Sequence, residues 1–282
     1  MRDKFLFSVV MSVYRGDKPN FFREALDSIT VNQTLQPAEI VLVVDGPVSG
    51  LIDDIIAHYQ SWYSNPDEPC YINVVRLEQN AGLGNALKLG VEAARYEYVA
   101  RMDSDDISLP YRFERQAEFL MGNSDVDIVG GNISEFVGSL DNIVGSRVVP
   151  QSNEQIFDYI KSRCPLNHMS VMFRKSAVQA AGGYIDWHYN EDYYLWVRMA
   201  LIGCKFANLP QTLVNVRVGA EMYARRGGYK YFKSEADLQR FIYRKGLISL
   251  PRMWYNVLLR FVLQVCMPNW LRGWVFKHLA RE

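Results

Sequence analysis

Short, almost fully apolar segments alternate with amphipathic segments through the first hundred residues, and this alternation limits the folds open to the chain. The apolar segments cover residues 5–14, 39–44, 71–77 and 96–102, and the amphipathic ones cover residues 20–30, 51–62 and 82–94. The apolar segments have the length and composition of buried strands, whereas the others repeat apolar residues at helical spacing. Buried strands separated by helices are typical of a parallel sheet covered on both faces. We therefore predict an α/β fold that binds ligands at the carboxyl ends of its strands.

The alternation loosens after residue 107. Ser108-Leu109-Pro110 resembles the start of a helix, with a serine cap and a proline in the first turn, and we expect this helix to reach about residue 121. Further strands are expected over residues 127–135, 143–149 and 170–174, helices over residues 154–162 and 191–201, and extended chain over residues 204–218. The sequence ends with helix-like segments over residues 235–245, 251–266 and 269–280.

Charge is unevenly distributed along the chain. Lys and Arg balance Asp and Glu over the 282 residues, and zero net charge argues against a strongly basic nucleic-acid-binding protein. Residues 225–282, however, hold twelve Lys and Arg against three Asp and Glu, a net charge of +9, and are rich in Trp, Leu, Val and Phe. This pattern favours an amphipathic extension on an anionic membrane surface, with a solvated tail or a helical hairpin packed on the preceding domain as alternatives. No run of eighteen apolar residues occurs, so we expect no transmembrane helix.

An acidic cluster follows the strand predicted over residues 96–102. Asp103, Asp105 and Asp106 place three carboxylates within four residues, and their repulsion calls for a compensating cation. Oxygen ligands at a strand end suit Mg²⁺ or Mn²⁺, which substrate phosphates often share. The alternative is an acidic turn or helix cap, but the position directly after a buried strand favours binding of a metal and a nucleotide.

Five motifs occur in an order and spacing that identify a family. They read SVVMSVYRGD at 8–17, VVDG at 43–46, NAGLGNALKLG at 80–90, ARMDSDD at 100–106 and NEDYYLWVRM at 190–199. In these motifs, over roughly residues 5–220, the chain resembles the family 2 glycosyltransferases, specifically the branch that builds bacterial O-antigen and capsular polysaccharide. The resemblance implies the GT-A fold, with a mostly parallel central sheet flanked by helices, a Mn²⁺ or Mg²⁺ cofactor and an inverting mechanism.

The resemblance also suggests how the chain is divided. Residues 1–230 would form the GT-A catalytic domain, with a nucleotide-binding half over residues 1–106 and an acceptor half over residues 107–230. Residues 231–282 would then be a basic, amphipathic and helical C-terminal extension.

Residues of the donor site follow from the same motifs. Ser12 and Tyr14 match positions that surround the nucleotide base, and Asp45 matches a carboxylate that accepts the uracil N3–H. Asp45 has a second interpretation as a turn former at the end of its strand. In the acidic cluster, Asp105 matches the direct metal ligand and Asp103 the member that contacts the ribose or a metal-bound water.

Arginines further along the chain extend the predicted donor site. Arg217, Arg225 and Arg226 precede two consecutive glycines. Arginines on a glycine-flexed loop suit a diphosphate and a loop that closes over it.

The acceptor side is predicted around the fifth motif. Asp192 matches the general base of the family, although adjacent carboxylates at a helix start are also favoured simply by the helix dipole. Glu191 and Trp196 are predicted to bind acceptor or donor hydroxyls, with a core position as the alternative for Trp196. His168 is predicted to contact the acceptor or a phosphate, or else to be a hydrogen-bonded loop histidine.

The resemblance therefore implies an enzyme that moves a glucose- or galactose-type hexose from a UDP-sugar to a polyprenyl-diphosphate-linked sugar. We expect it in the cytoplasm, peripheral on the inner face of the bacterial cytoplasmic membrane through its C-terminal helices, and without a nucleic-acid partner. The alternatives are a nucleotidyltransferase of similar fold and a non-catalytic sugar-nucleotide-binding protein. Asp192 argues against the first, which needs no base opposite the donor, and together with Asp105 it argues against the second.

Overall fold

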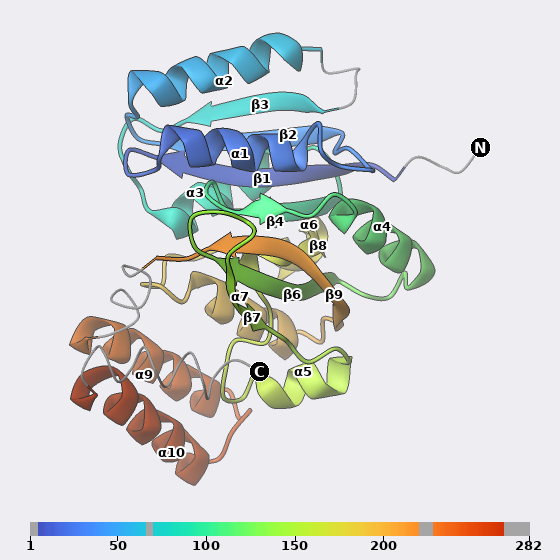
Figure 1. The fold of residues 1–282 in the computed structure, drawn as a ribbon. Helices are drawn as coiled ribbons and strands as arrows, with labels where there is room; N and C mark the ends of the chain where they lie inside the picture. Colours follow the sequence, from blue (N-terminus) through green and yellow to red (C-terminus); the bar gives the residue numbers. More distant parts are fainter. Residues whose placement is uncertain (1–4, 66–69, 220–227, 268–282) are drawn as a thin grey trace.

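Four parallel strands from the first half of the chain form one side of a sheet that has nine strands within the described residues (Figure 1). The computed structural model describes residues 5–65, 70–219 and 228–267. In the order in which they pair, the parallel strands are β3 (Tyr71–Arg76), β2 (Glu39–Asp45), β1 (Phe7–Tyr14) and β4 (Tyr98–Met102). These are the apolar segments predicted as strands, and their carboxyl ends meet at one edge of the sheet.

The other side of the sheet is mixed. Its strands are β5 (Ile107–Ser108), β6 (Ile128–Phe136), β7 (Ile143–Arg147), β8 (Met172–Arg174) and β9 (Phe206–Arg217). The short β8 pairs antiparallel with both β4 and β6, and β9 runs parallel to β6. β7 and β5 add antiparallel pairs to β6 and β9, respectively. Apart from the β6–β9 pair, parallel pairing among the described strands is thus confined to β1 to β4, which carry the predicted nucleotide-binding half.

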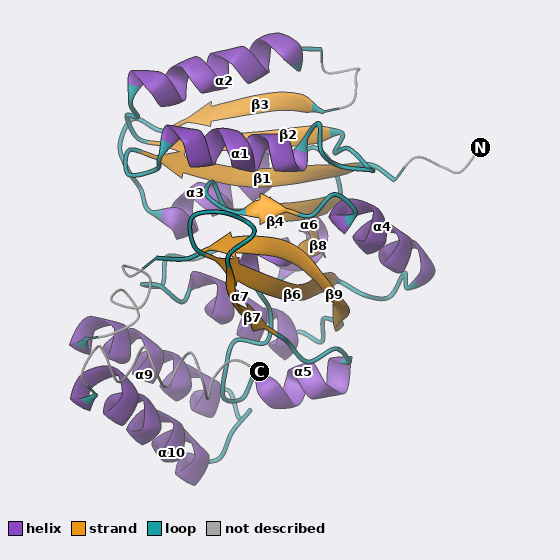
Figure 2. Cartoon of the chain, in the orientation of Figure 1, coloured by secondary structure: helices purple, strands orange, loops and turns teal. Residues whose placement is uncertain are grey.

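Helices cover both faces of the sheet (Figure 2). One face carries α1 (Pro19–Ile29), α2 (Gly50–Trp62) and α4 (Arg112–Gly122), and the other carries α3 (Leu83–Ala93), α6 (Lys175–Ala180) and α7 (Glu191–Leu201), with α5 (Asn153–Tyr159) packed beside them. Side chains alternate along a strand, so Val10 of β1 lies in the core under α3, whereas Met11 lies in the core under α1. The sheet therefore separates two hydrophobic cores.

Two helices from the C-terminal region form a hairpin that packs on the acceptor half (Figure 1). They are α9 (Tyr229–Arg244) and α10 (Leu250–Phe261), and a π-helical turn, η2 (Val262–Cys266), follows. Leu238 of α9 and Val257 of α10 are buried in the same core as Leu195 of α7. Residues 250–261 thus pack on the domain with α9 as their partner, although α10 also keeps an exposed apolar side. None of the described helices is long and apolar enough to cross a membrane, and the segment predicted over residues 269–280 lies outside the described residues.

Candidate active site

The carboxyl edge of the parallel strands gathers residues from three sequence motifs. Tyr14 ends β1 and pairs in register with Asp45, the last residue of β2. Asp103 follows β4, which lies on the other side of β1. Tyr14 is exposed, and Ser12 is partly buried beneath it in the same strand. Positions far apart in the sequence therefore meet where open α/β sheets bind ligands.

Asp45 is buried and holds a neighbouring loop in place. Its carboxylate accepts hydrogen bonds from Asn80 Nδ2 at 2.9 Å and from the backbone N–H groups of Ala81 and Gly82 at 2.6 and 3.1 Å. Gly46 permits this approach, because its φ is +83° and a Cβ there would lie 2.6 Å from the Asn80 nitrogen. A carboxylate has about four acceptor positions. One position is therefore left over after the loop has been bound.

Asp17 joins the acidic cluster that follows β4. Ser104 Oγ donates to an Asp17 oxygen at 2.9 Å, which ties the loop after β1 to the loop after β4. Burial and then the charges of Asp103 and Asp17 raise the pKa of Asp105 to about 6. Burial also raises the pKa of Asp17, with the charge of Asp103 adding to the effect. Three carboxylates therefore act on one another at the strand edge.

This cluster fits a divalent cation shared with a substrate. Repulsion between carboxylates disfavours their charged forms, and a cation between them removes that penalty. No three His, Cys, Asp or Glu side chains within the described residues form a complete metal site. Mg²⁺, however, commonly takes only one or two protein carboxylates and completes its shell with water and substrate phosphates. Asp103 and Asp105 are thus a chemically suitable pair.

Arg101 is a part of the site that the sequence prediction missed. It lies in β4 with 3% of its side chain exposed, and it forms an ion pair with Asp103. Its Nε and Nη1 atoms have no hydrogen-bond partner among the described residues. Burial raises the pKa of both Glu191 and Asp192, and the charge of Arg101 opposes this rise, so one buried cation acts on the acidic cluster and on the start of α7. An arginine inside the otherwise apolar run YVARM was the available signal.

Glu191 and Asp192 open α7 and have perturbed pKa values. Burial, followed by the charge of Asp192, raises the pKa of Glu191 to about 7, and Asp103 contributes in the same direction. Burial raises the pKa of Asp192, while hydrogen bonds to its carboxylate oppose the rise. These bonds come from the backbone N–H of Tyr193 at 2.6 Å and from Cys164 Sγ at 3.5 Å. The structure thus presents two adjacent carboxylates at the start of α7, and the charge of Glu191 also interacts with that of Asp103.

Two residues predicted on the acceptor side lie in the core. Trp196 is fully buried on the inner face of α7, with its ring centroid 6.0 Å from that of His168 and 6.5 Å from that of Tyr184. The prediction that Trp196 binds a sugar hydroxyl is therefore wrong, because none of its surface is accessible. His168 is 9% exposed, its Nε2 lies 2.8 Å from the Tyr184 hydroxyl, and burial holds its pKa well below the usual range. It is the hydrogen-bonded histidine of the alternative prediction.

Arg217, which the sequence assigns to the diphosphate, supports the acidic loop in the structure. Its guanidinium lies over the Phe21 ring at 3.8 Å, pairs with Glu24 at 2.5 Å and donates to the backbone carbonyl of Asp105 at 3.1 Å. Its backbone N–H donates to buried Asp106 at 2.9 Å. Each of the three guanidinium nitrogens thus has a partner within the protein. The arginines at positions 225 and 226 lie outside the described residues.

Comparisons with known proteins agree with this geometry. A family model described as "Glycosyl transferase family 2" matches residues 8–179. The chain is 40% identical to the amylovoran biosynthesis glycosyltransferase AmsE of Erwinia amylovora, over 83% of this chain and 85% of that protein. It is 36% identical to the Escherichia coli "UDP-Gal:alpha-D-GlcNAc-diphosphoundecaprenol beta-1,3-galactosyltransferase", over 98% of this chain and 97% of that protein.

Solved structures share the fold. Staphylococcus aureus TarS 1–349 in complex with UDP-GlcNAc superposes with a TM-score of 0.65 over 92% of this chain and 73% of that one. At 18% sequence identity, this likeness concerns the fold alone.

Proposed function

Because the chain belongs to glycosyltransferase family 2, we propose that it is an inverting enzyme that transfers a hexose from a UDP-sugar to a polyprenyl-diphosphate-linked sugar. One observation carries the choice of substrates. The 36% identity to the E. coli enzyme extends over almost the full length of both chains, and the name of that enzyme specifies a UDP-Gal donor and a GlcNAc-diphosphoundecaprenol acceptor. A galactose- or glucose-type hexose and a role in O-antigen or capsule assembly follow as the working hypothesis.

In this proposal the uridine binds at the ends of β1 and β2. The exposed Tyr14 ring and Ser12 would face the base, and the acceptor position left on Asp45 would take the uracil N3–H. Asp45 then has two roles, since the same carboxylate fixes the loop over residues 80–82. Discrimination between uridine and guanosine donors would depend on both of these roles of Asp45.

The diphosphate would lie beside the acidic cluster. Asp103 and Asp105 are the residues that would hold Mn²⁺ or Mg²⁺, supported by Asp17 through Ser104 and by Arg101 through its ion pair with Asp103. When bound, the cation offsets the negative charge that develops on the departing diphosphate. Arg217 maintains the shape of this loop by holding the Asp105 carbonyl and the Asp106 carboxylate.

Asp192 would be the general base. The acceptor hydroxyl oxygen attacks the anomeric carbon while the bond from this carbon to the β-phosphate oxygen breaks, so the configuration inverts and UDP leaves. The hydroxyl proton passes to the Asp192 carboxylate, a step worth about 10²–10⁴-fold in rate. Glu191 has a pKa of about 7, so near neutral pH it can either donate to or accept from a sugar hydroxyl.

A donor and acceptor screen tests the proposed function. The full-length protein is incubated with Mn²⁺, a synthetic lipid-diphosphate-GlcNAc and, in separate reactions, UDP-, GDP- and dTDP-hexoses. We expect UDP release coupled to a disaccharide-lipid product whose new linkage has the inverted configuration by NMR. Release of inorganic diphosphate would instead select a nucleotidyltransferase, and donor binding without turnover would select a sugar-nucleotide-binding protein.

The exposed side of α10 supports the peripheral membrane location. Apolar side chains spaced at helical intervals remain accessible there, with Trp254 60% and Leu258 62% exposed, followed by Phe261 and by Val262 at the start of η2. Tryptophan favours the boundary between lipid and water. Each basic residue near an anionic leaflet adds about 1 kcal/mol, and the region from residue 225 onward has a net charge of +9. We propose that this face rests on the cytoplasmic leaflet, where a lipid-linked acceptor lies.

A further inference from the structure

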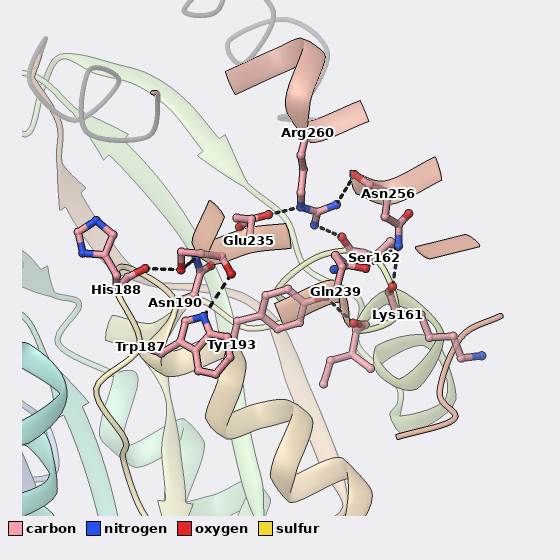
Figure 3. Close-up of polar contacts among 12 residues, drawn as sticks. Lys161, Ser162, Trp187, His188, Asn190, Tyr193, Glu235, Gln239, Asn256 and Arg260 are labelled. Atoms are coloured by element: carbon pink, nitrogen blue, oxygen red, sulfur yellow. Dashed lines mark hydrogen bonds and ion pairs between the residues drawn. The ribbon is translucent and has the colours of Figure 1, made fainter. Parts of the chain in front are cut away.

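The turn that leads into α7 is held by α9 from the C-terminal region. Ser234, which is buried in α9, donates from its hydroxyl to the His188 carbonyl at 2.6 Å and accepts from Asn190 Nδ2 at 3.1 Å. Its own carbonyl accepts from Trp187 Nε1 at 3.2 Å. Figure 3 shows Trp187, His188 and Asn190 gathered at this contact. A single serine thus binds three of the four residues that precede Glu191.

This turn has a conformation that depends on its surroundings. Tyr189, at its centre, has a φ of +58°, which is uncommon for a residue other than glycine and persists only where neighbouring contacts hold it. The Asn190 carbonyl that follows accepts the first hydrogen bond of α7, from the Tyr194 N–H at 2.9 Å. The orientation of the turn therefore fixes where α7 begins, and with it the carboxylates of Glu191 and Asp192.

The hairpin is fixed firmly enough to serve as this support. Arg260 of α10 pairs with Glu235 of α9 and donates to the Ser162 carbonyl, and Asn256 donates to the Lys161 carbonyl at 3.0 Å (Figure 3). Asn256 also donates to Gln239 Oε1 at 2.8 Å, which links the two helices of the hairpin. These contacts reach the segment that leads to Cys164, so the hairpin holds both the turn before α7 and the segment whose cysteine contacts Asp192.

We infer that Ser234 is a positioning residue for glycosyl transfer: it holds the turn over residues 187–190 so that Asp192 is presented in its reactive orientation. The inference rests on the proposed function, because it assigns Ser234 a part in that reaction. It makes the α9–α10 hairpin a component of the active site, although none of its described residues belongs to the sequence motifs.

Steady-state kinetics on three variants of the full-length protein test this inference. Ser234→Ala removes both hydroxyl contacts, and Ser234→Thr keeps a hydroxyl. Ser8→Ala is the matched control, because Ser8 is also buried and also makes two hydrogen bonds, but at the opposite end of β1. We expect Ser234→Ala to lower kcat by about tenfold or more, the usual consequence of a misplaced catalytic group, with the donor KM unchanged. Ser234→Thr should recover most of the rate, and Ser8→Ala should retain wild-type kcat.

Hydrogen exchange gives a second readout that does not require turnover. Amides of residues 187–192 should exchange faster in Ser234→Ala than in the wild type or in Ser8→Ala. Wild-type kcat in Ser234→Ala, or an equal loss in Ser8→Ala, would overturn the inference. If Ser234→Ala did not fold, Asn190→Ala would remove the other partner of the same bond and should show the same loss of kcat. A wild type that transferred no sugar would refute the proposed function, whereas unchanged exchange in Ser234→Ala would refute the positioning role.

Discussion

The thiol of Cys164 lies 3.5 Å from a carboxylate oxygen of Asp192 and 3.4 Å from the Leu166 carbonyl oxygen, and its one proton is shared between these two acceptors. Cys164 lies in the segment after α5, and Asp192 lies in the first turn of α7. Burial raises the pKa of Asp192, and the bond from the thiol opposes this rise because it stabilises the ionised form. The cysteine therefore helps to keep the proposed base deprotonated near neutral pH.

Removing this thiol should shift the pH dependence of transfer. A general base must be ionised, so kcat/KM falls on the acid side as pH drops through the pKa of Asp192. In Cys164→Ala the ionised carboxylate loses a donor, its pKa rises further, and the acid limb should move to higher pH. Cys164→Ser keeps a donor and should retain an acid limb near that of the wild type. A Cys164→Ala profile that overlays the wild-type profile would show that the thiol does not act on the base.

Transfer should require a divalent cation through Asp105. Like charges about 4 Å apart repel by about 4 kcal/mol at an effective dielectric constant of 20, and a bound diphosphate adds to this repulsion. We expect Asp105→Ala to abolish transfer, measured as UDP release, and to abolish the metal-dependent part of UDP binding, measured by calorimetry. Asp53→Asn on the surface of α2, where Asp53 pairs with Arg76, is the control and should behave as the wild type. Full activity in excess EDTA would contradict the prediction.

Replacing Asp45 should weaken recognition of uridine and loosen a loop. Asp45→Ala removes the acceptor for the Ala81 and Gly82 N–H groups, and loss of a hydrogen bond to a charged group costs about 1.5–3 kcal/mol. We expect a lower melting temperature, weaker UDP-sugar binding and a smaller preference for UDP over GDP donors in competition assays. A variant that keeps the wild-type preference would exclude Asp45 from base recognition.

Apolar residues on α10 should govern membrane binding. Transfer of one large apolar side chain out of water is worth about 1.5–3 kcal/mol, so Trp254→Ser or Leu258→Ser should weaken sedimentation with anionic liposomes by roughly tenfold or more. High salt should weaken it as well. Trp62→Ser is the control, because Trp62 is 65% exposed but lies on α2, at the opposite end of the molecule (Figure 1). Equal loss in the control, or no loss in the α10 variants, would place the contact elsewhere.

The sequence predicted the parallel half of the fold better than the rest. The strands β1, β2 and β4 are mostly apolar and largely buried, and the helices between the parallel strands have a clear period, so local pattern and final structure agree. The prediction that Ser108-Leu109-Pro110 begins a helix was wrong. Ser108 lies in β5 and pairs with Val214 of β9, and α4 begins only at Arg112. That pairing joins residues more than a hundred positions apart, and no local signal reports it. The six-residue α6 is too short to show a helical period.

The residues of the candidate site also fall into two groups, those that the sequence pattern predicted and those whose position depends on tertiary contacts. Motif residues such as Asp45 and Asp105 were predictable because strand ends in a parallel sheet meet at one edge. The position of Trp196 depends on which side of α7 packs inward, and the fixed side chain of Arg217 depends on Glu24 and Phe21 from α1. Such contacts follow from the tertiary structure. Ser234 belongs to the same class, since only the docking of α9 brings it to the start of α7.

The variant Asp192→Asn tests most directly whether Asp192 is the general base, because it separates donor binding from chemistry. This change keeps the size of the side chain and removes the base, so calorimetry should give UDP-sugar affinity close to that of the wild type. The rate of product formation under saturating substrates should fall about 10²-fold or more. Glu191→Gln, at the neighbouring position, should lose less of the turnover rate. Donor binding lost together with turnover would make Asp192 a donor ligand, and wild-type turnover in Asp192→Asn would remove it from the reaction altogether.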